Sequence, residues 1–368
     1  MSDRRKIAVI GASYLQLPLV RKAKELGLEV HCFAWEEGAV CKDVADFFYP
    51  ISIIEKEAVL DVCRKVGING ICTIASDIAA TTVSYVAEKM GLIANSYDVA
   101  VRANNKFLMR NALAKAGLPN PSYRAVSSVE EAQGIGLKYP LVVKPSDRSG
   151  SLGVTGIKAP EELAPAIEKA VSLSFSRQAM IEEFIEGREI SVEAISFQGV
   201  HYPLQITDKV TTGAPHFVEL EHHQPSTLPK EFFSRLYDIT RTALDALGIT
   251  DGASHSEYKI MDDGSIVIVE IGGRMGGDFI GSDLVRLSTG YDFLKGVIDV
   301  ALGEFSKPVK TMDRHSGVYF LCKETEYLRP VIENWKDNPA FIEGKILDEV
   351  LRNVECSADR SGYVISYG

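Results

Sequence analysis

The most informative run of this chain reads YPLVVKPSDRSGSLGV, from Tyr139 to Val154. Its apolar half predicts a buried strand that delivers Lys144, and its second half predicts a flexible loop of serines and glycines with one arginine. Such a loop exposes backbone N–H groups and hydroxyls, which suit phosphate oxygens, while the lysine supplies a positive charge. The GxxxxGK[ST] spacing of a Walker loop is absent. The run therefore predicts a phosphate-binding loop of another kind, although alone it also fits a surface loop with an incidental lysine.

The next charged run reads MIEEFIEGREISVE, from Met180 to Glu193. A predicted strand reaches Glu182 and Glu183, breaks at Gly187, and resumes through Glu189. Carboxylates and bare backbone at a strand break can bind a base edge and ribose hydroxyls. A salt-bridged hairpin on the surface is the competing interpretation.

A third run, SEYKIMDDGSIVIVEIGGR, predicts a hairpin with MDDG as its turn and with Glu257 and Glu270 on its two arms. An even-length loop places both glutamates on one face, and in one such register His255 faces Glu270. A three-residue bulged loop would break this inference. Two close carboxylates repel each other unless a cation lies between them, and so few oxygen ligands suit magnesium carried by a nucleotide. Two unrelated surface glutamates are the alternative.

The first hundred residues alternate between short apolar runs and helical patterns, which predicts βαβ units and a parallel sheet. Strands are expected at 7–10, 29–33 and 70–74, and helices at 15–26, 59–66 and 78–89. The turn GASYLQ after the first strand lacks the GxGxxG spacing, so it is weak support for NAD binding.

Composition excludes several classes of protein. A chain of 368 residues needs two or three lobes, and its net charge of −10 opposes a general nucleic-acid binder. No apolar run approaches the roughly 20 residues of a membrane span, and the N-terminus lacks the pattern of a signal peptide. The six cysteines form no CxxC pair and are expected to be buried free thiols. We therefore expect a cytoplasmic protein that binds neither nucleic acid nor membranes.

Taken in order, these pieces resemble the ATP-grasp ligases. The order is a lysine on a helix (NNKFLMRNALAKAG), the lysine–glycine loop, the EEFIEG hinge, the glutamate hairpin and an arginine. The lid KPSDRSGSLGV and the turn GGRMGGD are most similar to the L-amino acid ligase and carbamoyl-phosphate synthetase-like branch. The resemblance implies an α/β and α+β fold with four parts. They are an N-terminal parallel-sheet domain (1–103), a small lobe with phosphate lid and adenine hinge (104–197), a large lobe with the magnesium site (198–303) and a β-rich C-terminal subdomain (304–368).

The resemblance also assigns site residues. It implies that ATP is bound by the lysines, the lid and the hinge, and that Glu257 and Glu270 bind magnesium, with manganese as an alternative. The implied nucleotide-binding residues are Lys106, Lys144, Ser149, Gly150, Ser151, Gly153, Glu182, Glu183, Ile185 and Glu189. Arg274 is the implied catalytic residue, which stabilises an acyl phosphate. The family usually has asparagine, a further metal ligand, where this chain has Gly272. Gly276 and Gly277 are expected to leave room for a small carboxylate.

The implied function is that of a C–N bond-forming ligase, which joins a small carboxylate to an amine and releases ADP and phosphate. Amino acids are the favoured substrates, and a homodimer is left open. Candidates for the acceptor site lie in HFVELEHHQPSTLP, which holds His216, His222 and His223; an exposed loop with incidental histidines is the alternative. Two further alternatives are a purine-pathway or bicarbonate-type ATP-grasp enzyme and an ATP-binding regulatory protein that has lost catalysis.

Overall fold

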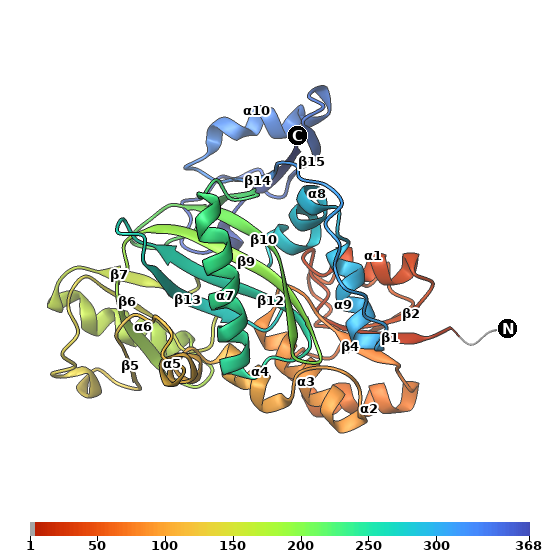
Figure 1. Ribbon diagram of the computed structural model, residues 1–368, viewed down its shortest axis with the longest axis horizontal. Coiled ribbons are helices and arrows are strands. Elements are labelled where there is room, and N and C mark those ends of the chain that lie inside the picture. Colours follow the sequence, from red (N-terminus) through yellow and green to blue (C-terminus); the bar gives the residue numbers. More distant parts are fainter. Residues whose placement is uncertain (1–3) are drawn as a thin grey trace.

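The computed structural model describes residues 4–368, which form three β-sheets flanked by helices. Figure 1 shows the N-terminal unit, in red and orange, beside a central sheet in green and cyan. A small yellow lobe lies at the opposite side of the central sheet, and the blue C-terminal segment lies at its upper end in this view. The predicted site residues come from more than one of these parts, so their packing creates the site.

The N-terminal unit is a parallel sheet, of order β3-β2-β1-β4, with helices on both faces. Along β1, Ile7 and Val9 enter one apolar cluster while Ala8 and Ile10 enter another, so both faces of the strand are buried. Its elements are β1 (Lys6–Ile10), α1 (Leu17–Glu25), β2 (Glu29–Phe33), β3 (Phe47–Tyr49), α2 (Lys56–Val66), β4 (Gly70–Cys72) and α3 (Asp77–Met90). The sequence does not predict β3; the other elements confirm the predicted alternation of strands and helices.

The small lobe is an antiparallel sheet, of order β5-β8-β6-β7, covered by α6. Leu141 and Ile181 pack against Ile167 of α6. Its elements are β5 (Tyr123–Val126), β6 (Leu141–Pro145), β7 (Thr155–Ile157), α6 (Leu163–Leu173) and β8 (Ala179–Glu183). Two helices precede it, α4 (Tyr97–Asn104) and α5 (Lys106–Lys115). Asn105 caps α5, because its side chain accepts hydrogen bonds from two amides of the first turn.

The central sheet has eight strands in the order β13-β12-β9-β10-β11-β14-β16-β15, and all its pairs are antiparallel. The strands are β9 (Arg188–Phe197), β10 (Val200–Thr211), β11 (Glu219–Gln224), β12 (Gly252–Ile260), β13 (Ile266–Gly272), β14 (Ser316–Leu321), β15 (Phe341–Ile346) and β16 (Gly362–Tyr367). Helix α7 (Lys230–Leu247) crosses one face, where Leu244 and Leu247 pack with Ile190 and Ile206. The remaining helices are α8 (Val285–Thr289), α9 (Phe293–Leu302) and α10 (Arg329–Glu333).

Strand pairing bears on the predicted domain boundaries. Strand β9 pairs with β10 and β12, so a boundary directly after β8 separates the sheets better than the predicted one at residue 197. At the other end, β14 pairs with β11, and β16 pairs with β14. The C-terminal strands therefore extend the central sheet instead of forming a sheet of their own.

The glutamate hairpin forms by a different route from the predicted one. Ile260 pairs with Ile266, which leaves an odd-length loop of residues 261–265. A β-bulge at Val269 then shifts the register, and Glu257 lies directly opposite Glu270. The premise of an even loop is wrong, but the two glutamates share a face because the bulge compensates for the odd loop.

Cysteine placement agrees with the expected free thiols: all six are unpaired, five are buried, and Cys356 is partly exposed. Within residues 4–368 no helix is both long enough and apolar enough to cross a membrane.

Candidate active site

A deep cavity lies between the small lobe and the central sheet, with about 980 Å³ of space counting the part open to solvent. All the predicted site residues except Gly153 line it: Lys106, Lys144, Ser149, Gly150, Ser151, Glu182, Glu183, Ile185, Glu189, Glu257, Glu270 and Arg274. Gly153 instead lies at the base of the lid, where a Cβ atom would come within 2.7 Å of Leu173. The structure therefore brings together residues from both lobes that lie far apart in the sequence.

Glu182 lies on the cavity floor between two cations. Its carboxylate accepts hydrogen bonds from Arg110 at 2.7 and 3.2 Å and lies 2.8 Å from the Lys144 ammonium. Burial alone would raise the pKa of Glu182, but the two positive charges lower it to about 2. Arg110 also donates to the carbonyls of Ile268 and Val269 at the β13 bulge. One buried arginine thus ties the predicted hinge to the predicted metal hairpin.

Lys106 occupies the first turn of α5 and points into the same cavity. Its ammonium lies 2.9 Å from Glu270 and 2.7 Å from the carbonyl of Arg148 in the lid. Burial would lower the pKa of Lys106, but Glu270 raises it, so the side chain stays charged. The helix cap at Asn105 fixes the direction in which this lysine leaves the helix. Lys106 and Lys144 therefore present two positive charges beneath the lid.

Apolar side chains flank the hinge end of the cavity. Val142, Val154 and Ile268 line it, and the rings of Phe184 and Phe217 stack with centroids 5.6 Å apart. A flat, apolar slot beside backbone groups suits a purine base. The charged end and the apolar end together have the character of a nucleotide site.

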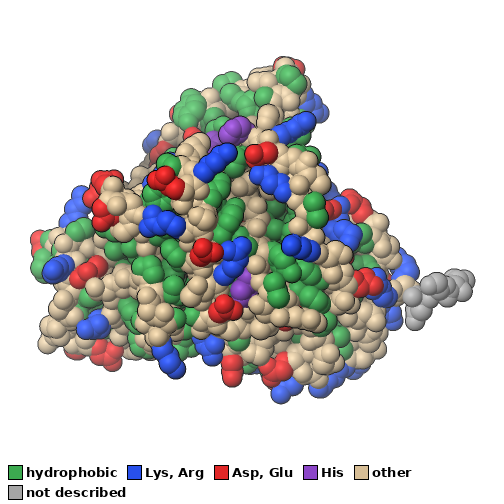
Figure 2. All heavy atoms as spheres, viewed as in Figure 1, with side chains coloured by type: hydrophobic (Ala, Val, Ile, Leu, Met, Phe, Trp, Pro, Cys, Tyr) green, Lys and Arg blue, Asp and Glu red, His purple; other side chains and the backbone are tan. Residues whose placement is uncertain are grey.

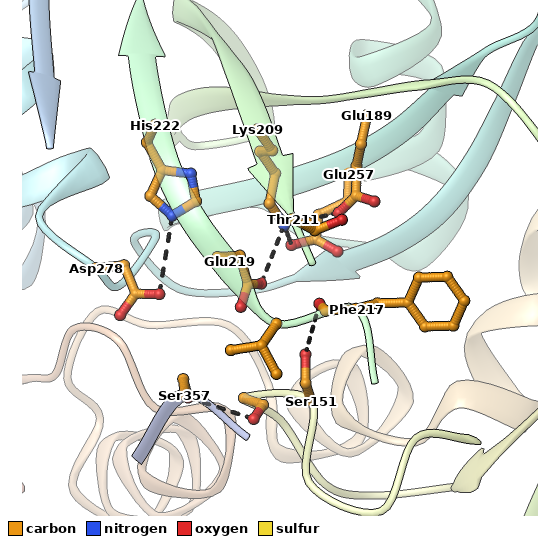
Figure 3. A network of polar contacts seen from close by, with 12 residues as sticks. Ser151, Glu189, Lys209, Thr211, Phe217, Glu219, His222, Glu257, Asp278 and Ser357 are labelled. Atoms are coloured by element: carbon orange, nitrogen blue, oxygen red, sulfur yellow. Dashed lines mark hydrogen bonds and ion pairs between the residues drawn. The ribbon is translucent and has the colours of Figure 1, made fainter. Parts of the chain in front are cut away.

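The opposite wall is acidic and is organised by Lys209 of β10 (Figure 3). The Lys209 ammonium lies 2.5 Å from Glu257, 3.2 Å from Glu189 and 3.4 Å from Glu219. Burial would lower the pKa of Lys209, but these carboxylates raise it well above its usual value. In turn, Lys209 and His255 hold the pKa of Glu257 well below its usual range, against the effect of burial. Lys209 and Glu257 are therefore both charged in the folded protein.

His255 differs from the predicted arrangement. It lies opposite Gly272 and not Glu270, because the odd-length loop and the bulge each shift the register by one residue. Its ring bonds to Glu193 through Nδ1 and lies 3.0 Å from Glu257 through Nε2. Burial would lower the pKa of His255, but the two glutamates raise it to about 9. The histidine is thus a buried cation that supports Glu257 from behind.

Arg274 follows the hairpin in the glycine-rich turn. Its Nη2 lies 2.9 Å from Asp77, the first residue of α3. Its Nε is buried and has no hydrogen-bond partner among residues 4–368. The expectation that Gly276 and Gly277 leave room for substrate is wrong. A Cβ atom at Gly276 would meet Glu193 and the His255 ring at 2.8–2.9 Å, and one at Gly277 would meet Ala75 at 3.3 Å. Neighbouring protein groups fill that space.

A second polar cluster lies next to the acidic wall (Figure 3). His222 of β11 is fully buried, its Nε2 lies 3.8 Å from Asp278, and neither ring nitrogen has a hydrogen-bond partner within the described residues. Burial lowers the pKa of His222, so the ring is neutral at neutral pH. Oε2 of Glu219 is also buried and unpaired. By contrast, His223 bonds to Glu221 and is partly exposed.

A family model for the ATP-grasp domain matches residues 137–283. The chain contains an ATP-grasp domain. In sequence it is 27% identical over 273 residues to alanine–anticapsin ligase of Bacillus subtilis, covering 64% of this chain and 57% of that protein. It is 32% identical over 202 residues to D-alanine–D-alanine ligase of Geobacter sulfurreducens, covering 52% of this chain and 61% of that protein. The chain thus spans less than two thirds of the length of these relatives.

Solved structures extend the likeness beyond the ATP-grasp domain. The L-amino acid ligase from Bacillus licheniformis superposes with a TM-score of 0.83 at 23% identity, covering 100% of this chain and 94% of that one. An N5-carboxyaminoimidazole synthase from Aspergillus clavatus, in complex with ADP, gives 0.80 at 16% identity, covering 100% and 95%. Such identities establish the fold alone: the chain has the ATP-grasp fold.

The ATP-grasp cavity has a donor set that fits a metal ion bound together with a nucleotide. Within residues 4–368 no three His, Cys, Asp or Glu side chains are already gathered as a metal site. Glu257 and Glu270 stand side by side, each neutralised by one lysine. Magnesium bound to a nucleotide needs only one or two protein carboxylates, because phosphate oxygens and water complete its shell. The hairpin supplies that number.

Several charged residues in and around the cavity could not be identified from the sequence alone. Arg110, Lys209 and Asp77 are single charged residues on two helices and a strand, and nothing in their local pattern distinguishes them from surface residues. The same is true of Asp278 and Arg360, which form a bidentate pair at 2.6 and 2.8 Å. Burial of a charge reveals such residues, and burial depends on packing between distant segments.

Proposed function

We propose that this chain is an ATP-dependent carboxylate–amine ligase that forms an acyl phosphate and acts on small metabolites, amino acids in the first place. The observation that carries the proposal is the meeting of Lys106, Lys144, the Glu257–Glu270 pair and Arg274 in one cavity. Two of the relatives named above are ligases of amino-acid-like substrates by name, which supports the same activity.

The nucleotide is assigned to the slot between hinge and lid. Its base lies between the Phe184 and Ile268 walls, with Ile185 and Glu183 offering backbone groups and Glu189 the ribose. Lys106 and Lys144 neutralise its phosphates. Glu257 and Glu270 hold magnesium or manganese, which when bound neutralises and orients the phosphates.

Two transfers follow from this placement. A carboxylate oxygen of the first substrate attacks the γ-phosphorus, the bond to the β-phosphate oxygen breaks, and ADP leaves. The amine nitrogen of the second substrate then attacks the acyl carbon, and phosphate leaves. Arg274 holds the carboxylate and then the oxyanion that forms at the same carbon. No covalent enzyme nucleophile is required.

The amine is assigned to the cluster around His222. Formation of the new C–N bond releases a proton from the amine, and the neutral His222 ring has an unpaired nitrogen to accept it. The unpaired Glu219 oxygen suits an ammonium group before it is deprotonated. His216 and His223 have no role in this proposal.

Release of ADP and phosphate across a panel of acids and amines tests the function. We expect ADP only when a carboxylate and an amine are both present, and no turnover after metal is removed with EDTA. Arg274→Ala is expected to lower kcat/KM by about 10²–10³-fold, the usual effect of losing a donor to an oxyanion. Arg241→Ala, on the exposed side of α7, is the matched control.

The outcomes separate the alternatives. ADP release with bicarbonate alone would instead assign a carboxylase-type activity, which the likeness to a carboxyaminoimidazole synthase keeps open. Binding of an ATP analogue without turnover on any pair would assign a regulatory role. A cytoplasmic location and a homodimeric state stay predictions from the sequence.

A further inference from the structure

The N-terminal domain reaches the glycine-rich turn through the start of α3. Ser76 caps this helix, and Asp77, its first residue, places Oδ2 2.9 Å from Nη2 of Arg274. Next to it, the Ala75 amide donates to the carbonyl of Met275 at 3.1 Å. The side chain of Asp77 is 8% exposed and that of Arg274 12% exposed, so this contact between domains is nearly dry.

Gly272 makes room for the Asp77 carboxylate. A Cβ atom at Gly272 would lie 2.8 Å from Asp77 Oδ1, closer than Cβ atoms approach an oxygen. Because side chains alternate along a strand, position 272 faces the same side as Glu270. The Asp77 carboxylate therefore occupies the space that a side chain of residue 272 would fill. Asparagine, which the resemblance leads one to expect here, would have to displace the Asp77 carboxylate.

Charge explains what the contact does for Arg274. Burial would lower the pKa of Arg274, but Asp77 raises it, with smaller contributions from Glu270 and Glu257. One edge of the guanidinium is held, since Nη2 donates to Asp77 and Nη1 lies 3.3 Å from the Met275 carbonyl. Nε remains buried and unpaired, and Arg274 lines the cavity. A guanidinium fixed at one edge presents its remaining donor in one direction.

We infer that Asp77 is a positioning residue for Arg274, and that Gly272 is required because the positioning carboxylate comes from the N-terminal domain. The inference rests on the proposed function, since it assigns Arg274 to the carboxylate substrate. Asp77 does not line the nucleotide cavity, so its effect is confined to the carboxylate step.

Moving the carboxylate from one domain to the other tests the inference. The variants are Asp77→Ala, Gly272→Asp and the double variant Asp77→Ala/Gly272→Asp, with the exposed Asp61→Ala of α2 as control. We expect Asp77→Ala to lower kcat/KM for the carboxylate by about 10–100-fold, the effect of a misplaced catalytic group. KM for ATP stays unchanged. Gly272→Asp is impaired because two carboxylates compete for one space, and the double variant recovers most of the activity.

Chemical modification provides a readout that does not need turnover. Phenylglyoxal reacts with the neutral form of a guanidine. Losing Asp77 should therefore raise the rate at which the Arg274 peptide is modified by about threefold or more. The double variant should return it to the wild-type rate. An unchanged rate in Asp77→Ala, or a double variant no better than the worse single variant, would overturn the inference. Absence of wild-type turnover would refute the proposed function alone, because the modification rates still decide whether Asp77 holds Arg274.

Discussion

Lys209 determines the state of the acidic wall. It is a buried cation among Glu189, Glu219 and Glu257. Glu189 has a second cation in Lys259 and Glu257 has one in His255, each at 3.0 Å, whereas Glu219 has no other within the described residues. Glu219 therefore shares its cation with two other carboxylates. Removing one partner from a buried ion pair leaves an uncompensated charge, which costs far more than the pair contributes. We interpret Glu219, which has no cation of its own among the described residues, as the feature that prepares this wall for a further cation.

His255 makes folding stability depend on pH. Its pKa is about 9 in the folded protein, and an unfolded histidine has a pKa of about 6.5. A raised folded pKa contributes stability fully below about pH 6.5, and this contribution disappears as pH rises towards 9. We expect the free energy of unfolding of the wild type to exceed that of His255→Gln by about 3 kcal/mol at pH 6. This difference should decline as the pH rises to 9.

Urea unfolding between pH 6 and 9.5 measures this difference. His315→Gln, at an exposed position, is the control and should show no such trend. If the free energies of unfolding of the wild type and His255→Gln differ by the same amount at both ends of this pH range, the proposed charge state of His255 is contradicted.

At the scale of elements, a connection and a hairpin set the cavity's shape. The β13 bulge brings Glu257 and Glu270 face to face, and its free carbonyls are satisfied by Arg110. The link from β8 to β9 passes so close to β12 that a Cβ atom at Gly187 would lie 2.5 Å from the Ile260 carbonyl oxygen. Only glycine allows the small lobe's hinge to approach the central sheet this closely.

Gly187→Ala should therefore move the hinge away from β12. We expect a loss of about 1–3 kcal/mol from the clash, together with weaker binding of an ATP analogue. Gly199→Ala is the matched control, because Gly199 also has positive φ but no atom lies within 4 Å of its added Cβ. Thermal unfolding and nucleotide titration of both variants measure the effects. Equal losses of nucleotide affinity in the two variants would show that the close approach does not matter.

At the scale of the whole molecule, the C-terminal segment closes the site from outside the lobes. Arg360 binds Asp278 with two hydrogen bonds, and the Ser357 amide donates to the lid carbonyl of Gly150 at 3.3 Å. Asp278 and Phe279 both have positive φ, at 51° and 64°, which is costly for residues other than glycine. Arg360 holds this strained corner and links the C-terminal strands to the turn that carries Arg274.

Figure 2 shows one face of the molecule, where Lys, Arg, Asp and Glu are scattered rather than gathered into a single-sign patch.

Arg360→Ala should release that corner. Asp278 would become a buried carboxylate without a cation, and we expect a loss of about 3–5 kcal/mol of stability and a fall in ligase activity. Arg360→Lys should be intermediate, because lysine cannot form the bidentate pair. Arg352→Ala, which removes an exposed pair with Asp348, is the control. Thermal unfolding and ADP release are the measurements, and wild-type stability in Arg360→Ala would contradict the proposed role.

The sequence by itself determined the fold class, the order of the motifs and most of the residues named above that line the cavity. Those features are local: a strand followed by a glycine loop, or a turn between alternating strands, has a signature within about twenty residues. The resemblance of these motifs singled out Lys106, Lys144 and the glutamate pair, and all four line one cavity. The sequence also showed that Gly272 stands where the family usually has asparagine, but it did not show the physical reason for the glycine.

Only the tertiary structure decided which charges are buried and what neutralises them. Arg110, Lys209, Asp77 and Arg360 each have a charged partner 48 or more residues away along the chain, so no local pattern marks them. The bulge at Val269 likewise depends on Arg110, which donates hydrogen bonds to its exposed carbonyls. Together with the odd-length loop, the bulge changed the predicted partner of His255. Desolvation makes an unpaired charge costly, and desolvation exists only once distant segments pack together.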